Sequence, residues 1–214
     1  MTNTSIEPSR ATNDSTDQRL LSAAEQLFAE RGVDAVSLRA IMGAAGTNVA
    51  SVHYHFGSKE RLIEALLDKY LHQIETRRFA LLDTAEDAGT LRSIAEAIVM
   101  PLAEIGEDGG TAWLSTLGKL LISGHPALIA MGASFQPQAA RLQELILRLR
   151  PQAQLPAIRF GVTHAVTLTC VVLGDTAHTN RLMSLSGTYL DEGQMRAQLI
   201  DMVTAILAGP PNAG

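Results

Sequence analysis

The chain has 214 residues, enough for one or two domains that bury a full hydrophobic core. Its hydrophobic content is 46% with only 4% aromatic residues, which favours helices over sheets, and its net charge of −5 argues against a protein that coats nucleic acid indiscriminately. The single cysteine, Cys170, cannot form an internal disulfide, so a reducing compartment, the cytoplasm, is expected.

The N-terminal segment is polar. Residues 1–16 are rich in Thr, Asn and Ser and have almost no large apolar side chains, which predicts a disordered arm. A capping box at Ser15–Gln18 is expected to begin a first helix, whose apolar residues recur on one face. Gly32 is expected to end it.

Two short helices are predicted next. Ser37 is expected to cap the first of them, and Gly46 supplies the backbone freedom for a sharp turn. The second spans roughly residues 48–56, and Gly57 ends it before Ser58 caps a long helix. Two short helices joined by a glycine-containing turn match the helix-turn-helix unit, whose second helix enters the DNA major groove.

The stretch "LLSAAEQLFAERGVDAVSLRAIMGAAGTNVASVHYHFGSKERLIEALL" resembles the N-terminal domain of the tetracycline-repressor (TetR) family of bacterial transcription regulators. The similarity covers residues 17–67, and beyond it the chain is similar to the family in length and helical content. The resemblance implies a helix-turn-helix DNA-binding domain over residues 17–60. It also implies a helical ligand-binding and dimerisation domain over residues 61–208, and residues 209–214 are expected to be a disordered tail.

The resemblance implies DNA contacts from nine residues: Ser37, Arg39, Val49, Ala50, Ser51, His53, Tyr54, His55 and Lys59. Lys59 is similar to the family's phosphate-binding lysine, and His53 stands where the family commonly has a phosphate-contacting tyrosine. Val49 either touches a thymine methyl or packs in the core, and Ser37 is either a phosphate contact or only a cap. Tyr54 either faces the groove or is merely an exposed aromatic residue.

The charge pattern agrees with a DNA-facing surface, because no Asp or Glu occurs from Ala35 through Lys59.

A metal site is not expected. His53 and His55 on a helix point to faces about 200° apart, so they cannot both bind one metal ion.

The remaining sequence predicts further helices. The segments "EDAG", "GEDGG", "SGHP", "FQPQ", "RPQAQLP" and "SGTYLDEG" separate helix-length stretches, so an all-α fold of about nine helices is expected. "VTLTCVV" has the composition of a buried strand, but it lacks a partner strand and is interpreted as a buried helix containing an inert Cys170. The apolar run at 160–174 is too short to span a bilayer, so no membrane anchor is expected.

A ligand pocket is implied by the resemblance, and large apolar side chains in the middle helices are the candidates to line it. They are Met100, Trp113, Leu117, Met131, Phe135 and Phe160, with His164 as a polar contact. The alternative for each is ordinary core packing. Neither a catalytic constellation nor a phosphate loop accompanies the scattered histidines, so no enzyme activity and no cofactor are expected.

A dimer is expected from the last helix, in which apolar residues form a stripe at helical spacing: Met195, Leu199, Met202, Val203 and Ile206. Together with this stripe, the resemblance implies a homodimeric repressor that binds a double-stranded, palindromic DNA operator and is released by a small apolar or amphipathic effector. The alternatives are an activator or ligand-independent regulator, or a helical enzyme or scaffold that does not bind DNA.

Overall fold

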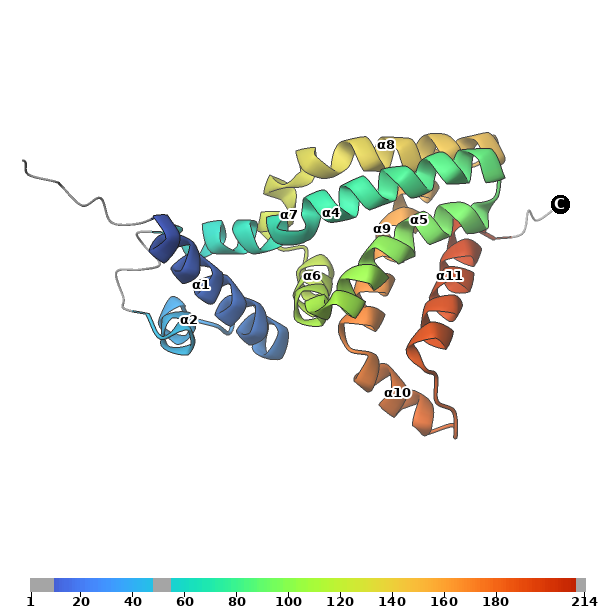
Figure 1. The fold of residues 1–214 in the computed structure, drawn as a ribbon. Coiled ribbons are helices and arrows are strands. Elements are labelled where there is room, and N and C mark those ends of the chain that lie inside the picture. The colour runs from blue at the N-terminus through green and yellow to red at the C-terminus, as the bar shows by residue number, and fades with distance from the viewer. Residues whose placement is uncertain (1–9, 48–54, 211–214) are drawn as a thin grey trace, which may run out of the picture. The chain divides into compact units, whose positions relative to one another are not determined.

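The computed structural model describes residues 10–47 and 55–210, and within these ranges it is helical and contains no strand (Figure 1). This confirms the all-α prediction. The chain divides into two compact units, unit 1 (Met1–Leu66) and unit 2 (Leu67–Gly214). The division falls inside the long helix α4 (Lys59–Ala88), so this helix belongs to both units.

Unit 1 is built from α1 (Arg10–Arg31), α2 (Leu38–Ala45) and the first turns of α4. Its core contains Leu20, Ala24, Phe28, Val33, Val36, Ile41, Met42, Ala45, Leu62, Ile63 and Leu66. The predicted start of the first helix is wrong, because α1 begins at Arg10 and places Ser15 inside the helix. The segment from Arg10 to Arg31 contains neither Gly nor Pro, so a helix that has formed propagates through its polar residues at small cost.

The predicted caps of unit 1 are confirmed. Ser37 caps α2, since its Oγ accepts a hydrogen bond from the Ala40 amide at 3.2 Å. Gly46 ends α2 in the left-handed region at φ 63°, which directs the chain into the predicted turn. Ser58 Oγ accepts from the Arg61 amide at 3.2 Å before α4. The predicted third helix, residues 48–56, lies almost entirely outside the described residues.

Unit 2 contains the rest of α4 and the helices that follow it. They are α5 (Leu91–Ile105), the kinked segment Gly106–Gly110, α6 (Thr111–Ser123), α7 (Pro126–Ala130), α8 (Gly132–Leu149), α9 (Leu155–Gly174), α10 (Thr176–Ser184) and α11 (Glu192–Ala208). One predicted helix boundary is wrong, and one observed boundary was not predicted. "FQPQ" lies within α8, which continues through Pro137, whereas the break between α9 and α10 at Asp175 was not predicted.

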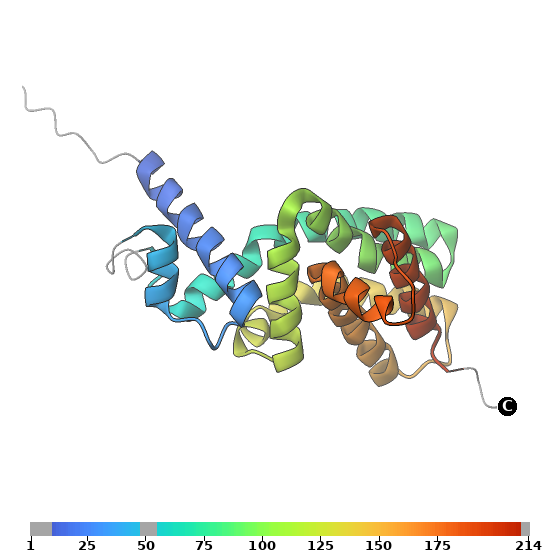
Figure 2. The ribbon, with the colours of Figure 1, turned by 90° about the horizontal axis from the view of Figure 1, so that it is seen from below.

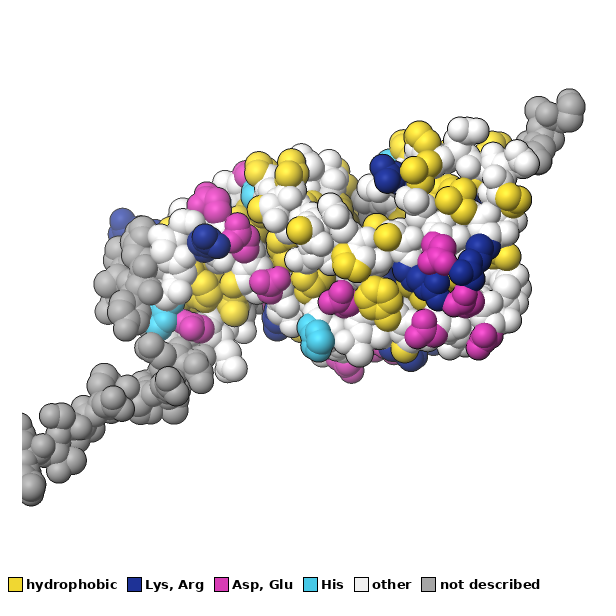
Figure 3. All heavy atoms as spheres, turned by 90° about the horizontal axis from the view of Figure 1, so that it is seen from above, with side chains coloured by type: hydrophobic (Ala, Val, Ile, Leu, Met, Phe, Trp, Pro, Cys, Tyr) yellow, Lys and Arg dark blue, Asp and Glu magenta, His cyan; other side chains and the backbone are white. Residues whose placement is uncertain are grey.

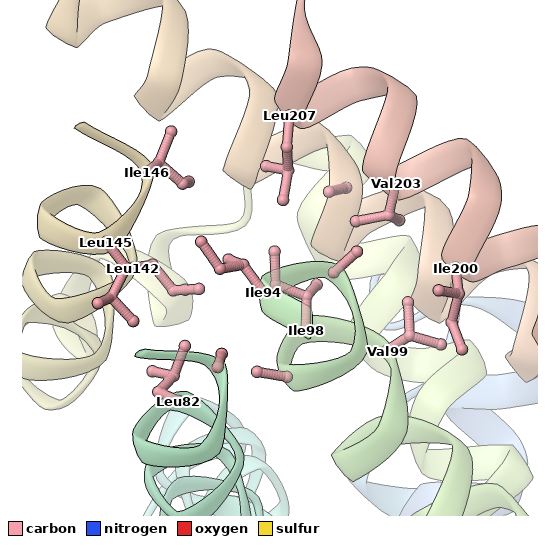
Figure 4. Close-up of a cluster of buried hydrophobic side chains, with 14 of the residues drawn as sticks. Leu82, Ile94, Ile98, Val99, Leu142, Leu145, Ile146, Ile200, Val203 and Leu207 are labelled. Atoms are coloured by element: carbon pink, nitrogen blue, oxygen red, sulfur yellow. The ribbon is translucent and has the colours of Figure 1, made fainter. Parts of the chain in front are cut away.

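The core of unit 2 is centred on α5 (Figure 4). Ile94 and Ile98 of α5 lie among apolar side chains from α4, α8 and α11, and all of these are buried. The surrounding residues include Leu82, Leu142, Leu145, Ile146, Val203 and Leu207. Three helices far apart in the sequence are therefore held together by one face of α5.

The contact between α6 and α9 depends on small residues. A Cβ atom at Gly174 would lie 2.5 Å from the Ser115 backbone nitrogen, so the backbones of the two helices touch at this point. A Cβ atom at Gly118 would meet the backbone of Cys170 at 3.4 Å, an ordinary contact distance. Close approach at these two points sets the spacing of helices that line a cavity, described below.

Charged side chains join α4 to α8 on the surface of unit 2. Glu86 of α4 is ion-paired with Arg141 and Arg148 of α8, and Glu144 pairs with the same two arginines. Basic and acidic side chains lie side by side on the face seen in Figure 3. The Arg148 and Arg141 guanidinium groups hold the pKa of Glu86 below its ordinary value.

The helix α9 is strongly apolar but largely uncovered. By length and composition alone it could cross a membrane, and only 28% of its apolar window is buried inside the chain. The run at 160–174 is only part of this helix, which extends back to Leu155, so its length does not argue against a membrane span. Figure 2 shows α10 between the end of α9 and the extended segment that leads to α11. Exposed apolar side chains occur on α9, α10 and α11, including Phe160, Leu182 and Met202.

Candidate functional site

Unit 1 presents the first turn of α2 to solvent. Ser37 and Arg39 are both exposed there, and the turn contains no acidic residue. Backbone amides at the start of a helix and a nearby guanidinium form a site that suits a phosphate group. Five other residues predicted to contact DNA lie outside the described residues: Val49, Ala50, Ser51, His53 and Tyr54.

Lys59 and His55 both make contacts within unit 1. The Lys59 ammonium donates to the Val33 carbonyl at 2.7 Å, and it lies 6.0 Å from the centroid of the Phe28 ring. An ammonium has three donors, so this bond leaves donors for an anion. The His55 side chain is 9% exposed and its Nδ1 lies 2.5 Å from Asp17 Oδ1 of α1. His55 is therefore directed into unit 1, which corrects the prediction that it faces the DNA backbone.

Unit 2 contains a partly open cavity of about 280 Å³, whose lining includes the exposed residues Ala139 and Thr163. Its wall comes from α4, α5, α6, α7, α8 and α9. The lining residues are Leu67, Leu71, Ile74, Arg78, Leu102, Trp113, Leu117, Leu121, Leu128, Phe135, Gln138, Ala139, Leu142, Val162, Thr163 and Val166. The wall is thus almost wholly apolar, with a few polar groups among the aliphatic and aromatic side chains, as is usual for small-molecule sites.

Arg78 is the charged residue of this wall. Its side chain is buried, and its Nε donates to the Ala97 carbonyl of α5 at 3.1 Å. That carbonyl has no donor within its own helix, because the residue four positions later is Pro101, which lacks an N–H. Burial lowers the pKa of Arg78 to about 10, so the guanidinium is charged at neutral pH.

Gln138 is the polar neighbour of Arg78 in the cavity wall. Its Oε1 accepts from Arg78 Nη1 at 2.5 Å, and the residue is 2% exposed. A guanidinium can only donate, so the amide oxygen must face Arg78 and the amide nitrogen must point away. Within the described part of the chain, that Nε2 atom is buried without a hydrogen-bond partner. An unsatisfied buried donor is unfavourable, and a ligand with an acceptor group would satisfy it.

Comparison with known proteins places this architecture in a family. Residues 20–66 match the family model of bacterial regulatory proteins, tetR family. The chain is 30% identical over 193 residues to the HTH-type transcriptional repressor Rv3405c of Mycobacterium tuberculosis, covering 88% of this chain and 87% of that protein. The chain belongs to the TetR family. It is therefore a transcriptional regulator, and regulators of this family are not enzymes.

Other relatives share either the N-terminal region or the fold. The KstR2 repressor of Mycolicibacterium smegmatis is 39% identical over 66 residues, which are 31% of this chain and 32% of that repressor. Crystal structures of the haemolysin II regulator HlyIIR and of PfmR from Thermus thermophilus each superpose with a TM-score of 0.57 at 19% identity. The matches cover 90% of this chain and 99% of HlyIIR, and 97% of this chain and 100% of PfmR.

The structure brings three of the predicted ligand residues of this TetR-family protein together in the cavity: Trp113, Leu117 and Phe135. Trp113 also packs edge-on against Tyr70, with 5.2 Å between the ring centroids. Met100 and Met131 pack outside the cavity lining, so ordinary core packing is the better interpretation for them.

The prediction that Phe160 and His164 line the ligand cavity is wrong. Phe160 is 67% exposed, its ring stacks on His164 at 4.0 Å, and His164 Nδ1 donates to the Phe160 carbonyl at 2.8 Å. They lie on the outer face of α9, about 200° round the helix from the cavity-lining Val162 and Val166. A helix that is apolar all round gives no sequence signal for which face meets the cavity.

Sequence reasoning missed Arg78 and Gln138. The signal for Arg78 was present, because Leu67, Leu71, Ile74 and Arg78 recur at the spacing of one helix face. An arginine on an apolar face is rarely buried without a specific role. Gln138 had no comparable signal, since it follows Pro137 in a segment that was predicted to be a loop.

Only part of the apolar stripe predicted to form the dimer interface is exposed on the subunit. Met195, Leu199 and Val203 are buried in the core of the same chain, where α11 packs on α5, so their periodicity reflects the fold of the subunit. Met202 is 49% exposed and Ile206 is half-buried next to Gly161 of α9.

Proposed function

We propose that this protein is a repressor that binds a palindromic operator in the cytoplasm as a homodimer and releases it when a small molecule enters the cavity of unit 2. The observation that carries the proposal is the apolar cavity with a buried arginine and an unsatisfied amide in its wall. A core that served stability alone would fill this space with side chains.

The DNA-binding part of the proposal rests on unit 1. Ser37 and Arg39 are exposed at the start of α2, and the segment from Ala35 through Lys59 has no acidic residue. Two relatives named above, Rv3405c and KstR2, are HTH-type transcriptional repressors. We infer that α2 and the residues following Gly46 approach the duplex and that Lys59 contacts a phosphate.

The dimer part rests on the surface of α9 and α11. Phe160 and Val171 of α9 and Met202 of α11 are large exposed apolar side chains, and the two helices pack against each other. An exposed apolar surface shared by two packed helices marks an interaction site. A second copy of the same helices would cover it, and the resulting two-fold axis would match a palindromic operator.

The ligand part rests on α4. This helix carries Lys59 in its first turn and four residues of the cavity wall, Leu67, Leu71, Ile74 and Arg78. A ligand that shifts α4 on binding therefore acts directly on the helix that leads into the DNA-binding unit. For the ligand to release DNA, it must bind the DNA-incompetent arrangement more tightly than the competent one.

The test begins with selection of duplexes by the purified full-length protein from a random DNA library. We expect a palindromic consensus, two chains per duplex in sedimentation, and affinity that falls steeply with salt. Absence of any preferred sequence would contradict the proposal. Selective binding that no compound in a panel of amphipathic metabolites weakens would instead identify a ligand-independent regulator.

A further inference from the structure

We propose that the effector is a small organic monocarboxylate with a compact apolar body, whose carboxylate is bound by Arg78 and Gln138. This inference rests on the proposed function, because it names the chemical class of the molecule that occupies the cavity. It is carried by the charge and hydrogen-bonding state of these two residues.

The Arg78 guanidinium is a buried charge in the cavity wall. Among residues 10–47 and 55–210, no carboxylate lies within ion-pair distance of its guanidinium, and the lining of the cavity includes neither Asp nor Glu. Cys170 does not supply the charge, since burial raises the pKa of its thiol to about 12 and keeps it neutral. A buried cation without a counter-ion is costly, and an anionic ligand would compensate it.

The hydrogen bonds of the Arg78 guanidinium divide it into two parts. One edge holds the fold together, and the other faces the ligand. The Nε edge of Arg78 is occupied by the Ala97 carbonyl that Pro101 leaves without a donor. On the other side, Nη1 donates to Gln138 Oε1, and the amide Nε2 remains a buried donor without a partner in the described structure. A carboxylate has two oxygens that accept hydrogen bonds from both a guanidinium and an amide N–H.

The size and polarity of the cavity restrict the rest of the molecule. One buried cation balances one negative charge, which favours a monocarboxylate over a phosphate dianion. A volume of about 280 Å³ is close to the lower limit of roughly 300–1,000 Å³ for small-molecule sites, so the apolar body is compact. Trp113, Leu117 and Phe135 provide its apolar contacts.

The experiment compares carboxylates with alcohols of matched shape: octanoate with 1-octanol, and 3-phenylpropanoate with 3-phenyl-1-propanol. Binding to the full-length protein at neutral pH is measured by calorimetry and by the fluorescence of Trp113, the sole tryptophan. We expect at least one carboxylate to bind about tenfold or more tightly than its alcohol, since hydrogen bonds to charged groups are the stronger ones. Equal or tighter binding of the alcohols would overturn the inference.

Two substitutions with matched controls test the residues. Gln138→Glu places a carboxylate beside Arg78, so we expect carboxylate binding to be lost while alcohol binding persists. Gln136→Glu adds the same charge at an exposed position of the same helix, so it should change neither carboxylate binding nor alcohol binding. Retained alcohol binding also shows that the cavity is intact.

Arg78→Met should likewise abolish the preference for carboxylates, whereas Arg77→Met should preserve it, because Arg77 is exposed and pairs with Glu104. A carboxylate preference that survives both Gln138→Glu and Arg78→Met would overturn the assignment of these residues. If none of the four compounds binds the unmodified protein, the ligand-binding part of the proposed function fails along with this inference. Tight binding of the alcohols alone overturns only the inference.

Discussion

The substitution Gly174→Ala tests the helix packing that forms the cavity. The new Cβ atom would lie 2.5 Å from the Ser115 nitrogen and 2.6 Å from its Cα, whereas carbon atoms in contact are about 3.5 Å or more apart. The clash involves backbone rather than a flexible side chain, so α6 and α9 must separate by roughly 1 Å. Overpacking of this kind costs about 1–3 kcal/mol.

The assay is thermal unfolding followed by circular dichroism and by the fluorescence of Trp113, which lies on α6. The expected cost corresponds to a Tm lower by about 2–12 °C, at roughly 2–4 °C per kcal/mol for a domain of this size. Gly118→Ala is the matched control, because its Cβ would meet α9 at an ordinary 3.4 Å, and it should stay within about 1 kcal/mol of the parent. A Gly174→Ala protein as stable as the parent would refute the close approach of these helices.

Three further predictions concern the DNA contact, the dimer and the surface ion pairs. Lys59→Met should flatten the dependence of log K on log salt by about one to two units, since a dimer would lose two phosphate contacts; an unchanged slope removes Lys59 from the interface. Met202→Asp should raise the dimer dissociation constant by two orders of magnitude or more, because an unpaired buried charge costs about 3–5 kcal/mol, whereas Ile129→Asp, at an exposed position of α7, should leave the sedimentation of the dimer unchanged. Glu86 has its pKa lowered by Arg148 and Arg141, so its stabilisation is present above its ordinary value of 4.5 and is lost as the pH falls through the lowered value. The Tm of Glu86→Gln should therefore fall less steeply on acidification than that of the parent, and parallel curves would contradict the role of these ion pairs.

Local signals in the sequence predicted local structure well. Ser37, Gly46 and Ser58 act through hydrogen bonds and dihedral angles within a few residues of themselves, so their roles as caps and turns could be predicted without tertiary information. The start of α1 was predicted less well, because Ser15 can cap a helix but nothing requires a helix to begin at a good cap.

Periodicity showed which residues are buried but not what buries them. The stripe on α11 was assigned to a partner subunit, yet Leu199 and Val203 are covered by α5 of the same chain. On α9, which is apolar on several faces, Phe160 and His164 were assigned to the cavity although they lie on the outer surface.

The pairing of Arg78 with Gln138 at the polar end of the cavity could not be deduced from neighbouring residues. Arg78 and Gln138 are sixty residues apart in the chain and meet only after α4 and α8 have packed. Pro101 leaves the Ala97 carbonyl of α5 without its helical donor, but the use of Arg78 as the replacement donor depends on how α4 packs on α5. Such a site depends on tertiary contacts, which a single sequence does not show.

The central claim, that a ligand in the cavity releases DNA, is tested most directly by one titration of the protein–operator complex with octanoate. Fluorescence anisotropy of a labelled operator reports DNA release, and Trp113 fluorescence in the same cuvette reports occupancy of the cavity. We predict that both signals change over the same concentration range and that neither changes in Gln138→Glu. Saturation of the Trp113 signal while the operator stays bound would contradict the account.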